Sequence, residues 1–480
     1  MTSDKYPAKQ HARTVTKQLF SLQPKFFSSD LNNSGSPLFL LASPQSVNWP
    51  FCDQQQPFRQ NRNFYYLSGC DRPDCYLTYD TLNDKLVLYL PPIDDEDVMW
   101  SGMPETILEA QEHYDVDEIR LTPQLGSDVS ILVDRTVFTV EPLVKAETRK
   151  EAFITATFGH LRESDPFLLS ALEEARLTKD EYELSLMRRA SLISDKAHYR
   201  VMANLKEAFN ETHVHAEFVY HSIREGSKNQ SYDPICCSGR TCSTLHWVTN
   251  DQDTAGKQLL LIDAGAEWKN YASDVTRVLP FNGEWTKEAR SIYDLVLKMQ
   301  SECMSRVRPG ILWDDLHLLA HEILIEGFLE LGIFKGGSKE EILESRISAA
   351  FLPHGLGHTL GMDTHDTAGH ANYSDPDLLF RYLRIRRKLI PGMMITVEPG
   401  VYFSPFVIDP FLKGELGQPG AEKYIDRLLL EKYWDVGGVR IEDDVLVTEN
   451  GFENFTKVTK DPDEIAEIVK SGKAPDWVYV

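Results

Sequence analysis

Two short segments in the middle of the chain each combine strand-forming residues with an aspartate. The apolar run 259–262 ends in Asp263, and the strand-forming segment 271–277 carries Asp274. Only a short polar stretch separates them, so we expect a hairpin that brings the two carboxylates together. Carboxylates that close repel one another unless a positive group lies between them. The alternative is that one aspartate ends a strand and the other lies in a turn.

Three histidines lie close together in and after the segment PHGLGH, namely His354, His358 and His365. The proline and glycines argue against a helix, and the acid of a helical HExxH zinc motif is missing. We therefore expect a loop whose glycines let the backbone pass close to an ion or a substrate. A coincidental cluster on the surface is the alternative.

Two glutamates stand in further strand-like motifs, Glu398 in TVEPG and Glu442 in VRIEDD. Strand alternation places Arg440, Glu442 and Asp444 on one face of the second motif. Taken alone, either glutamate is more often solvated or ion-paired than a metal ligand.

Together these motifs suggest a metal centre made of Asp263, Asp274, His358, Glu398 and Glu442. Carboxylates with one imidazole suit manganese, cobalt or zinc. Four carboxylates balance two divalent ions, so we predict two ions bridged by a hydroxide that attacks a carbonyl carbon. A nearby histidine must stabilise the oxyanion and pass a proton to the leaving nitrogen. The candidates are His246, His354 and His365.

Composition narrows the class of protein. Fifty basic and 73 acidic residues give a formal charge of −23, which disfavours nucleic acid as a partner. The seven cysteines contain no CxxC pair, which is typical of a reducing compartment. The sequence also shows no secretory signal and no run long enough to cross a membrane, so we expect a cytoplasmic protein without a membrane partner.

The order of patterns predicts an α/β (α+β) protein with two domains, 1–175 and 176–480. In the first, the apolar runs 38–42 and 86–90 predict buried strands. Near the boundary, Thr178 and Glu181 resemble a capping box that opens a helix reaching about residue 205. Later segments predict helices over 292–307 and 312–331 and strand motifs over 259–278, 393–403 and 438–447.

The motifs DAG, SDVTR, PHGLGH, TVEPG and VRIED make this chain resemble the Xaa-Pro aminopeptidase and Xaa-Pro dipeptidase (prolidase) family. The resemblance implies a pita-bread catalytic metallopeptidase domain over 176–480, preceded by a smaller aminopeptidase-P-type α/β domain. It implies an exopeptidase that cleaves the bond between an N-terminal residue and a penultimate proline in peptides, with two divalent ions, manganese first. A homodimer is also implied.

The resemblance further implies individual roles. His354 matches a proton shuttle, His246 a histidine on the substrate side and His365 a histidine that lines the proline pocket. Tyr232 matches a tyrosine beside the first metal-binding aspartate and Arg440 an arginine that supports the site opposite the ligands, and both are predicted, with Arg384, to bind the substrate. Arg384 matches an arginine that reads the carboxylate of a dipeptide, which slightly favours a dipeptidase; alternatively it belongs to a solvated basic stretch. The competing functions are a non-catalytic interaction module of the same fold and a same-fold hydrolase of other substrates.

Overall fold

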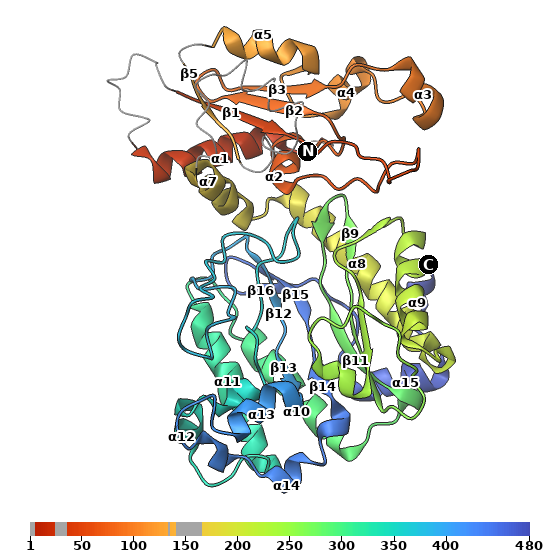
Figure 1. Cartoon of the computed structure of the whole chain (residues 1–480), viewed down its shortest axis with the longest axis vertical. Coiled ribbons are helices and arrows are strands. Elements are labelled where there is room, and N and C mark those ends of the chain that lie inside the picture. The colour runs from red at the N-terminus through yellow and green to blue at the C-terminus, as the bar shows by residue number, and fades with distance from the viewer. Residues whose placement is uncertain (1–4, 25–35, 133–134, 141–165) are drawn as a thin grey trace. The chain divides into compact units, whose positions relative to one another are not determined.

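The computed structural model describes residues 5–24, 36–132, 135–140 and 166–480 (Figure 1). The chain divides into two compact units, Met1–Arg176 and Leu177–Val480. The sequence places this boundary one residue earlier.

The first unit is built on a five-stranded sheet with the strand order β4-β3-β2-β1-β5. The pairs β1–β2 and β2–β3 are antiparallel, whereas β3–β4 and β1–β5 are parallel. Strands β1 and β3 confirm the two strands predicted from apolar runs. The strands are β1 (Ser36–Ala42), β2 (Tyr76–Asp80), β3 (Lys85–Leu90), β4 (Glu118–Leu121) and β5 (Arg135–Phe138). The helices are α1 (Ala8–Leu22), α2 (Arg62–Ser68), α3 (Asp95–Ser101), α4 (Ile107–His113), α5 (Leu125–Ser130) and α7 (Pro166–Leu177), which ends beside the boundary.

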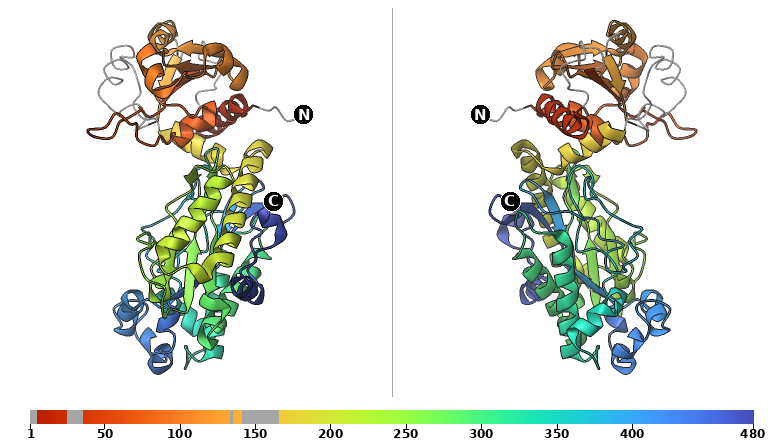
Figure 2. Two further views of the ribbon diagram at one scale, coloured as in Figure 1. Left: turned by 90° about the vertical axis from the view of Figure 1, so that its right-hand side faces the viewer. Right: turned by 90° about the vertical axis from the view of Figure 1, so that its left-hand side faces the viewer.

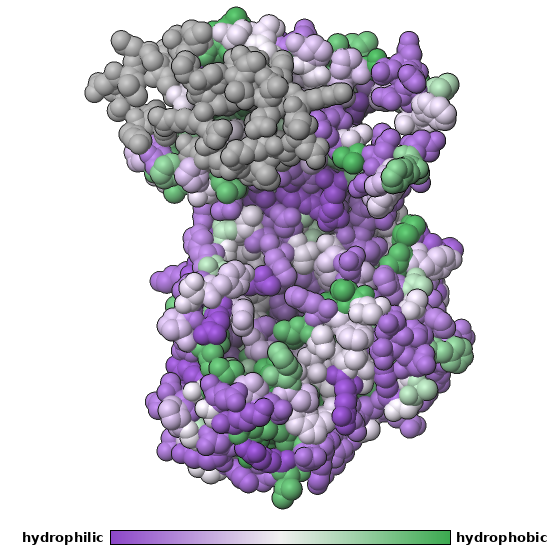
Figure 3. Space-filling view, viewed as in Figure 1, coloured by the Kyte–Doolittle hydropathy of each residue, from purple (hydrophilic) through white to green (hydrophobic). Residues whose placement is uncertain are grey.

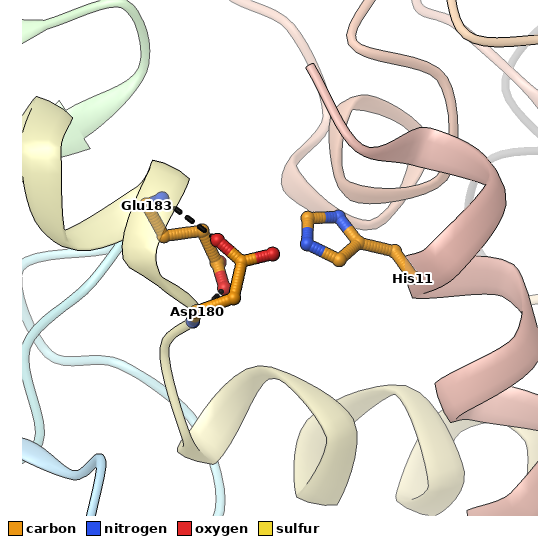
Figure 4. Close-up of side chains that lie close together, drawn as sticks. All are labelled: His11, Asp180 and Glu183. Atoms are coloured by element: carbon orange, nitrogen blue, oxygen red, sulfur yellow. Dashed lines mark hydrogen bonds between the residues drawn. The ribbon is translucent and has the colours of Figure 1, made fainter. Parts of the chain in front are cut away.

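The second unit begins with the long helix α8 (Glu181–Asn204). Its N-cap is Asp180, whose side chain accepts a hydrogen bond from the Glu183 amide, while the Glu183 side chain accepts one from the Asp180 amide (Figure 4). The predicted capping box of Thr178 and Glu181 is therefore wrong by two residues. Thr178 cannot cap the helix because its backbone is extended and pairs with Met393.

Small sheets form the centre of the second unit, and one of them carries the predicted hairpin. Strands β8 and β11 pair antiparallel, with β7 on the other side of β8. A second hairpin, β9–β10, is inserted between them. The other two predicted strand motifs are each broken at the glutamate of interest. The strands are β6 (Asn229–Gln230), β7 (Ile235–Ser238), β8 (Leu259–Asp263), β9 (Ala266–Trp268), β10 (Tyr271–Ala272), β11 (Thr276–Pro280), β12 (Met394–Val397), β13 (Gly400–Tyr402), β14 (Gly438–Arg440), β15 (Asp443–Val447) and β16 (Phe452–Asn454).

Two pairs of helices pack on these strands (Figures 1 and 2). Helix α8 contacts β9 and β10, and its neighbour α9 contacts β7. Helix α10 contacts β12, β13 and β14 and packs on α11. Helices α10 and α11 confirm the two predicted helices. The helices that follow α8 in this unit are α9 (Glu211–Arg224), α10 (Lys287–Met304), α11 (Trp313–Leu331), α12 (Lys339–Glu344), α13 (Pro405–Leu412), α14 (Arg427–Leu430) and α15 (Pro462–Ser471).

The surface is predominantly hydrophilic in the view of Figure 3, with apolar residues scattered over it. Phe406 and Leu428 are among the large apolar side chains that are mostly exposed. Among the helices that the structure describes, none is both long and apolar enough to cross a membrane.

Candidate metal centre

A cavity of about 320 Å³ in the second unit collects the predicted site residues. Every candidate from the sequence lines it except Tyr232, which reaches the same place through its hydroxyl group. The lining candidates are His246, Asp263, Asp274, His354, His358, His365, Arg384, Glu398, Arg440 and Glu442. They come from separate stretches of the chain between residues 246 and 442, so the fold gathers them and no single motif does.

The two aspartates of the predicted hairpin do lie together. Asp263 ends β8, and Asp274 lies two residues before the start of β11. The hydroxyl group of Tyr232 is within hydrogen-bond distance of an oxygen of each aspartate, at 2.5 Å from Asp274 Oδ1. On the far side of Asp263, Arg440 Nη2 donates to Oδ2 at 2.6 Å. The pair is thus bridged by a phenol, and one guanidinium group pairs with Asp263.

His358 faces three of the carboxylates. Its Nε2 atom lies 3.3 Å from Asp274 Oδ2, 3.4 Å from Glu398 Oε1 and 3.9 Å from Glu442 Oε1. Its Nδ1 atom lies 3.0 Å from the Thr359 carbonyl oxygen, so Nδ1 carries the hydrogen and Nε2 keeps a free lone pair. Ligand atoms of Asp274, His358 and Glu442 all lie within 4.8 Å of one another, which is close enough to share an ion.

The electrostatics of this cluster fit divalent cations. Burial raises the pKa of Asp274 well above its usual range, and the charge of Asp263 adds to the effect. Burial likewise raises the pKa of Glu442, and it raises that of Glu398 to about 7. Arg440 is the one guanidinium group that pairs with these acids in the described part of the chain. Asp263, Asp274 and Glu442 are buried and Glu398 is partly buried. When ionised, these four carboxylates with one cation are strongly anionic, so the donor set suits two divalent ions.

A chain of hydrogen bonds runs behind the carboxylates to His354. Arg440 Nη1 donates to the Tyr402 hydroxyl oxygen at 2.9 Å, and this hydroxyl lies 2.8 Å from His354 Nε2. His354 Nδ1 lies 2.7 Å from the Gly355 carbonyl oxygen. Because the carbonyl can only accept, Nδ1 carries the hydrogen and Nε2 accepts from Tyr402. The chain fixes one tautomer of a neutral imidazole.

A further layer of side chains holds the carboxylates in place. The Thr276 hydroxyl donates to Glu442 Oε2 at 2.6 Å. The Asp274 amide donates to Asp444 Oδ1 at 3.1 Å, so Arg440, Glu442 and Asp444 do turn toward the same neighbouring segment, 263–276, as strand alternation predicts. Such outer contacts orient the ligands of a metal site.

The loop around PHGLGH has no helix, as its glycines predict. A Cβ atom at Gly357 would lie 2.1 Å from the Thr396 carbonyl oxygen, so only glycine lets this backbone lie against β12. The loop thereby places His358 beside Glu398, which follows the end of β12.

Arg384 lies on another wall of the cavity. It is half-buried, and its Nη1 atom lies 3.2 Å from the Tyr373 hydroxyl oxygen. The basic stretch around it is not uniformly solvated, since Arg386 pairs with Asp314 and Asp375. The position of Arg384 on the cavity wall therefore favours a binding role over a solvated face.

Sequence reasoning missed three tyrosines of the cavity, Tyr373, Tyr382 and Tyr402. Alternation along TVEPGVY could have indicated Tyr402, because β13 pairs with β14 and sets Gly400 opposite Arg440. Tyr373 and Tyr382 lie in an irregular stretch without a helical or strand period, so no local pattern marks them.

Comparison with known proteins identifies the class to which this fold and site belong. Residues 185–449 match the model of metallopeptidase family M24, and residues 20–138 match the N-terminal domain of aminopeptidase P. The chain therefore belongs to metallopeptidase family M24, its second unit is a pita-bread domain, and the predictions of fold and of a metallopeptidase are confirmed.

Particular relatives cover nearly the whole chain. A probable Xaa-Pro aminopeptidase from Botryotinia fuckeliana is 47% identical over 97% of this chain and 97% of its own length. One from Sordaria macrospora is also 47% identical, over 97% of this chain and 96% of its own. Among solved structures, aminopeptidase P from E. coli matches with a TM-score of 0.79 at 26% identity, covering 98% of this chain and 99% of that one.

Proposed function

We propose that this protein is an Xaa-Pro exopeptidase, which hydrolyses the bond between the first residue of a peptide and a proline in second position. The observation that carries the proposal is the convergence of four carboxylates and His358 in one cavity with three further imidazoles. The relatives named as probable Xaa-Pro aminopeptidases support the choice of substrate.

The five predicted ligands, Asp263, Asp274, His358, Glu398 and Glu442, would hold two divalent ions. Manganese is the first choice, with cobalt or zinc as alternatives, because hard carboxylate oxygens dominate the set. When bound, such ions lower the pKa of a water molecule and polarise the scissile carbonyl group.

The histidines of the cavity act as neutral groups. Burial, together with the charge of Arg440, lowers the pKa of His354 to about 3. Desolvation within the cavity also lowers the pKa of His246 and that of His365, and the neighbouring His358 adds to the shift of His365. Neutral imidazoles add no positive charge beside the metal ligands, yet they can still donate or accept a hydrogen bond at the reacting amide. His354 is the candidate for passing a proton, since the Gly355 carbonyl oxygen fixes its tautomer and Tyr402 links its Nε2 atom to Arg440.

Arg384 bears on the length of the preferred peptide. Its guanidinium group lines the cavity, where it could grip the carboxylate of a dipeptide with two hydrogen bonds. The slight preference for a dipeptidase rests on Arg384 and on the segment 439–440, whereas the names of the relatives favour an aminopeptidase. We therefore propose that both dipeptides and longer peptides enter the site, with Arg384 favouring the former.

The test is a hydrolysis assay on Ala-Pro, Ala-Pro-Ala and the proline-free peptide Ala-Ala-Ala. We expect chelation to abolish cleavage of the first two, manganese to restore it, and the third to remain intact. Glu442→Gln should be inactive, whereas Glu449→Gln, the same change at an exposed position on the same segment, should match the wild type. Arg384→Met should raise KM for Ala-Pro more than for Ala-Pro-Ala.

Two results would overturn the proposal. Cleavage of Ala-Ala-Ala at a comparable rate would indicate a same-fold hydrolase of other substrates. Loss of every cleavage in a protein that retains manganese would favour a non-catalytic interaction module.

We further propose a homodimer in the cytoplasm. The seven free cysteines, six of them buried, suit a reducing compartment. Light scattering tests the mass of the assembly, and fractionation of cells tests its location.

A further inference from the structure

A buried ion pair lies just outside the cavity. Lys179 Nζ lies 2.9 Å from Asp366 Oδ2, and both side chains are only 1% exposed. Nζ also donates to the Leu177 carbonyl oxygen at 3.3 Å. Removing two charges from water is costly, and a buried pair is often no more stabilising than apolar side chains of the same size. Its role is therefore better sought in what it holds in place.

Lys179 is presented from a fixed piece of backbone. Its amide donates to the Gly392 carbonyl oxygen at 2.9 Å, and the preceding Thr178 pairs with Met393. The following residue, Asp180, is the N-cap of α8. The backbone on both sides is thus tied to regular structure, so the ammonium group has a defined position.

Asp366 directly follows His365 and is tied down in turn. The Asp366 amide donates to the Thr359 carbonyl oxygen at 2.8 Å, and the Thr359 hydroxyl donates to the Asp366 carbonyl oxygen at 2.6 Å. On the other side of His365, the Thr364 hydroxyl donates to the Ser231 carbonyl oxygen at 3.2 Å. Both neighbours of His365 are therefore anchored.

The ring of His365 has no comparable anchor of its own. Its imidazole makes no hydrogen bond within the described ranges, and its edge meets the ring of His358 at a centroid distance of 4.5 Å. Because the side chain is exposed to the cavity, its position depends on the backbone that carries it.

Gly361 leaves room for the ion pair of Lys179 and Asp366. A Cβ atom there would lie 2.1 Å from Asp366 Oδ2 and 2.9 Å from Lys179 Cε. The ion pair thus occupies the space that any other residue at this position would fill.

We infer that Lys179 is a positioning residue for catalysis, because its ion pair with Asp366 holds the loop that sets His365 over the metal site. This inference rests on the proposed peptidase function. A shift of about 1 Å in a group that orients a substrate can cost on the order of 100-fold in rate.

The test is a double-mutant cycle between Lys179→Met and His365→Ala. We expect Lys179→Met to lower kcat on Ala-Pro about 10-fold to 100-fold with manganese content unchanged. In the His365→Ala background the same change should lower kcat by less than about twofold, because the group that it positions is gone. Equal losses in both backgrounds, or wild-type kcat in Lys179→Met, would overturn the inference.

Two further variants distinguish an effect on the position of His365 from a general loss of protein stability. Lys196→Met is the matched control, since Lys196 lies on α8, is 11% exposed and pairs with Glu225 at 3.1 Å, away from the cavity lining. It should keep wild-type kcat. Lys179→Arg, which retains the charge, should recover most of the rate, and it remains informative if Lys179→Met fails to fold.

The position of His365 can also be tested without an activity measurement. Carbethoxylation of His365 by diethyl pyrocarbonate, followed by mass spectrometry, should proceed severalfold faster in Lys179→Met because the ring is less tightly held. An unchanged rate would refute the positioning role even if the wild type proved inactive on proline peptides. Inactivity of the wild type with a changed rate would instead refute only the proposed function.

Discussion

The metal-free protein should be stabilised at alkaline pH by removing one of its own predicted ligands. Burial raises the pKa of Glu398 from 4.5 to about 7 in the absence of metal, and the nearby charges of Asp274 and Asp263 add to this rise. The folded state then prefers the protonated carboxyl group, whereas the unfolded chain ionises it near pH 4.5. As the pH rises through this window, the folded state loses stability relative to the unfolded state.

The size of the effect follows from the same values. A rise in pKa from 4.5 to about 7 corresponds to at most about 3 kcal/mol of destabilisation above pH 7. Glutamine has the same shape but no charge to desolvate. Metal-free Glu398→Gln should therefore be up to about 3 kcal/mol more stable than the wild type at pH 8, and nearly equal to it at pH 4.5.

Urea unfolding of chelator-treated protein at pH 4.5 and pH 8 measures this difference. Tryptophan fluorescence reports on the relevant unit, since six of the eight tryptophans lie after residue 177. With manganese present the order should reverse, because the wild type gains binding energy that the variant loses. A metal-free variant that is less stable than the wild type at pH 8, or a difference that does not change with pH, would refute the reasoning. The exposed Glu449→Gln should show no such difference.

Three further variants test the division of roles. Asp274→Ala should abolish both activity and metal binding, as measured by metal analysis of the dialysed protein; full activity would exclude the proposed centre. His354→Ala should retain metal but lose about 100-fold to 10,000-fold in kcat, and a loss of metal would make it a ligand. Tyr402→Phe removes the hydroxyl group that links Arg440 to His354, so kcat should fall about 10-fold to 100-fold with metal retained. A pH–rate profile identical to that of the wild type would show that this hydrogen-bond chain does not affect catalysis.

Much of the local chemistry of the site can be predicted from the sequence, because three of the five predicted ligands stand at the end of a strand-like run or interrupt one. Asp263 closes an apolar run, and Glu398 and Glu442 interrupt two others. An acidic residue at the end of an apolar strand is drawn toward the protein interior by that strand. Its residue type and the apolar pattern before it therefore already indicate a functional carboxylate. The glycines around His358 likewise predict a loop, and the close approach of Gly357 to Thr396 gives the reason.

The ends of helices and the breaks within strands are harder to predict from the sequence. The motif around Glu398 reads as one strand, but the structure breaks it into β12 and β13, which pair with different partners. The capping box is displaced from Thr178 to Asp180 because Thr178 is held in an extended backbone by Met393. In both cases pairing with a segment far away in the sequence decides the backbone conformation, and the local sequence pattern does not.

By itself the sequence determined the fold class and the class of chemistry, and it predicted a set of candidate metal ligands, because these depend on residue type and on periods of two or about four residues. The tertiary structure alone decided how those side chains are oriented. Tyr402 joins Arg440 to His354, and Lys179 meets Asp366 across 187 residues of chain. Such contacts depend on the pairing of β13 with β14 and on irregular loops that have no period, so no local pattern encodes them.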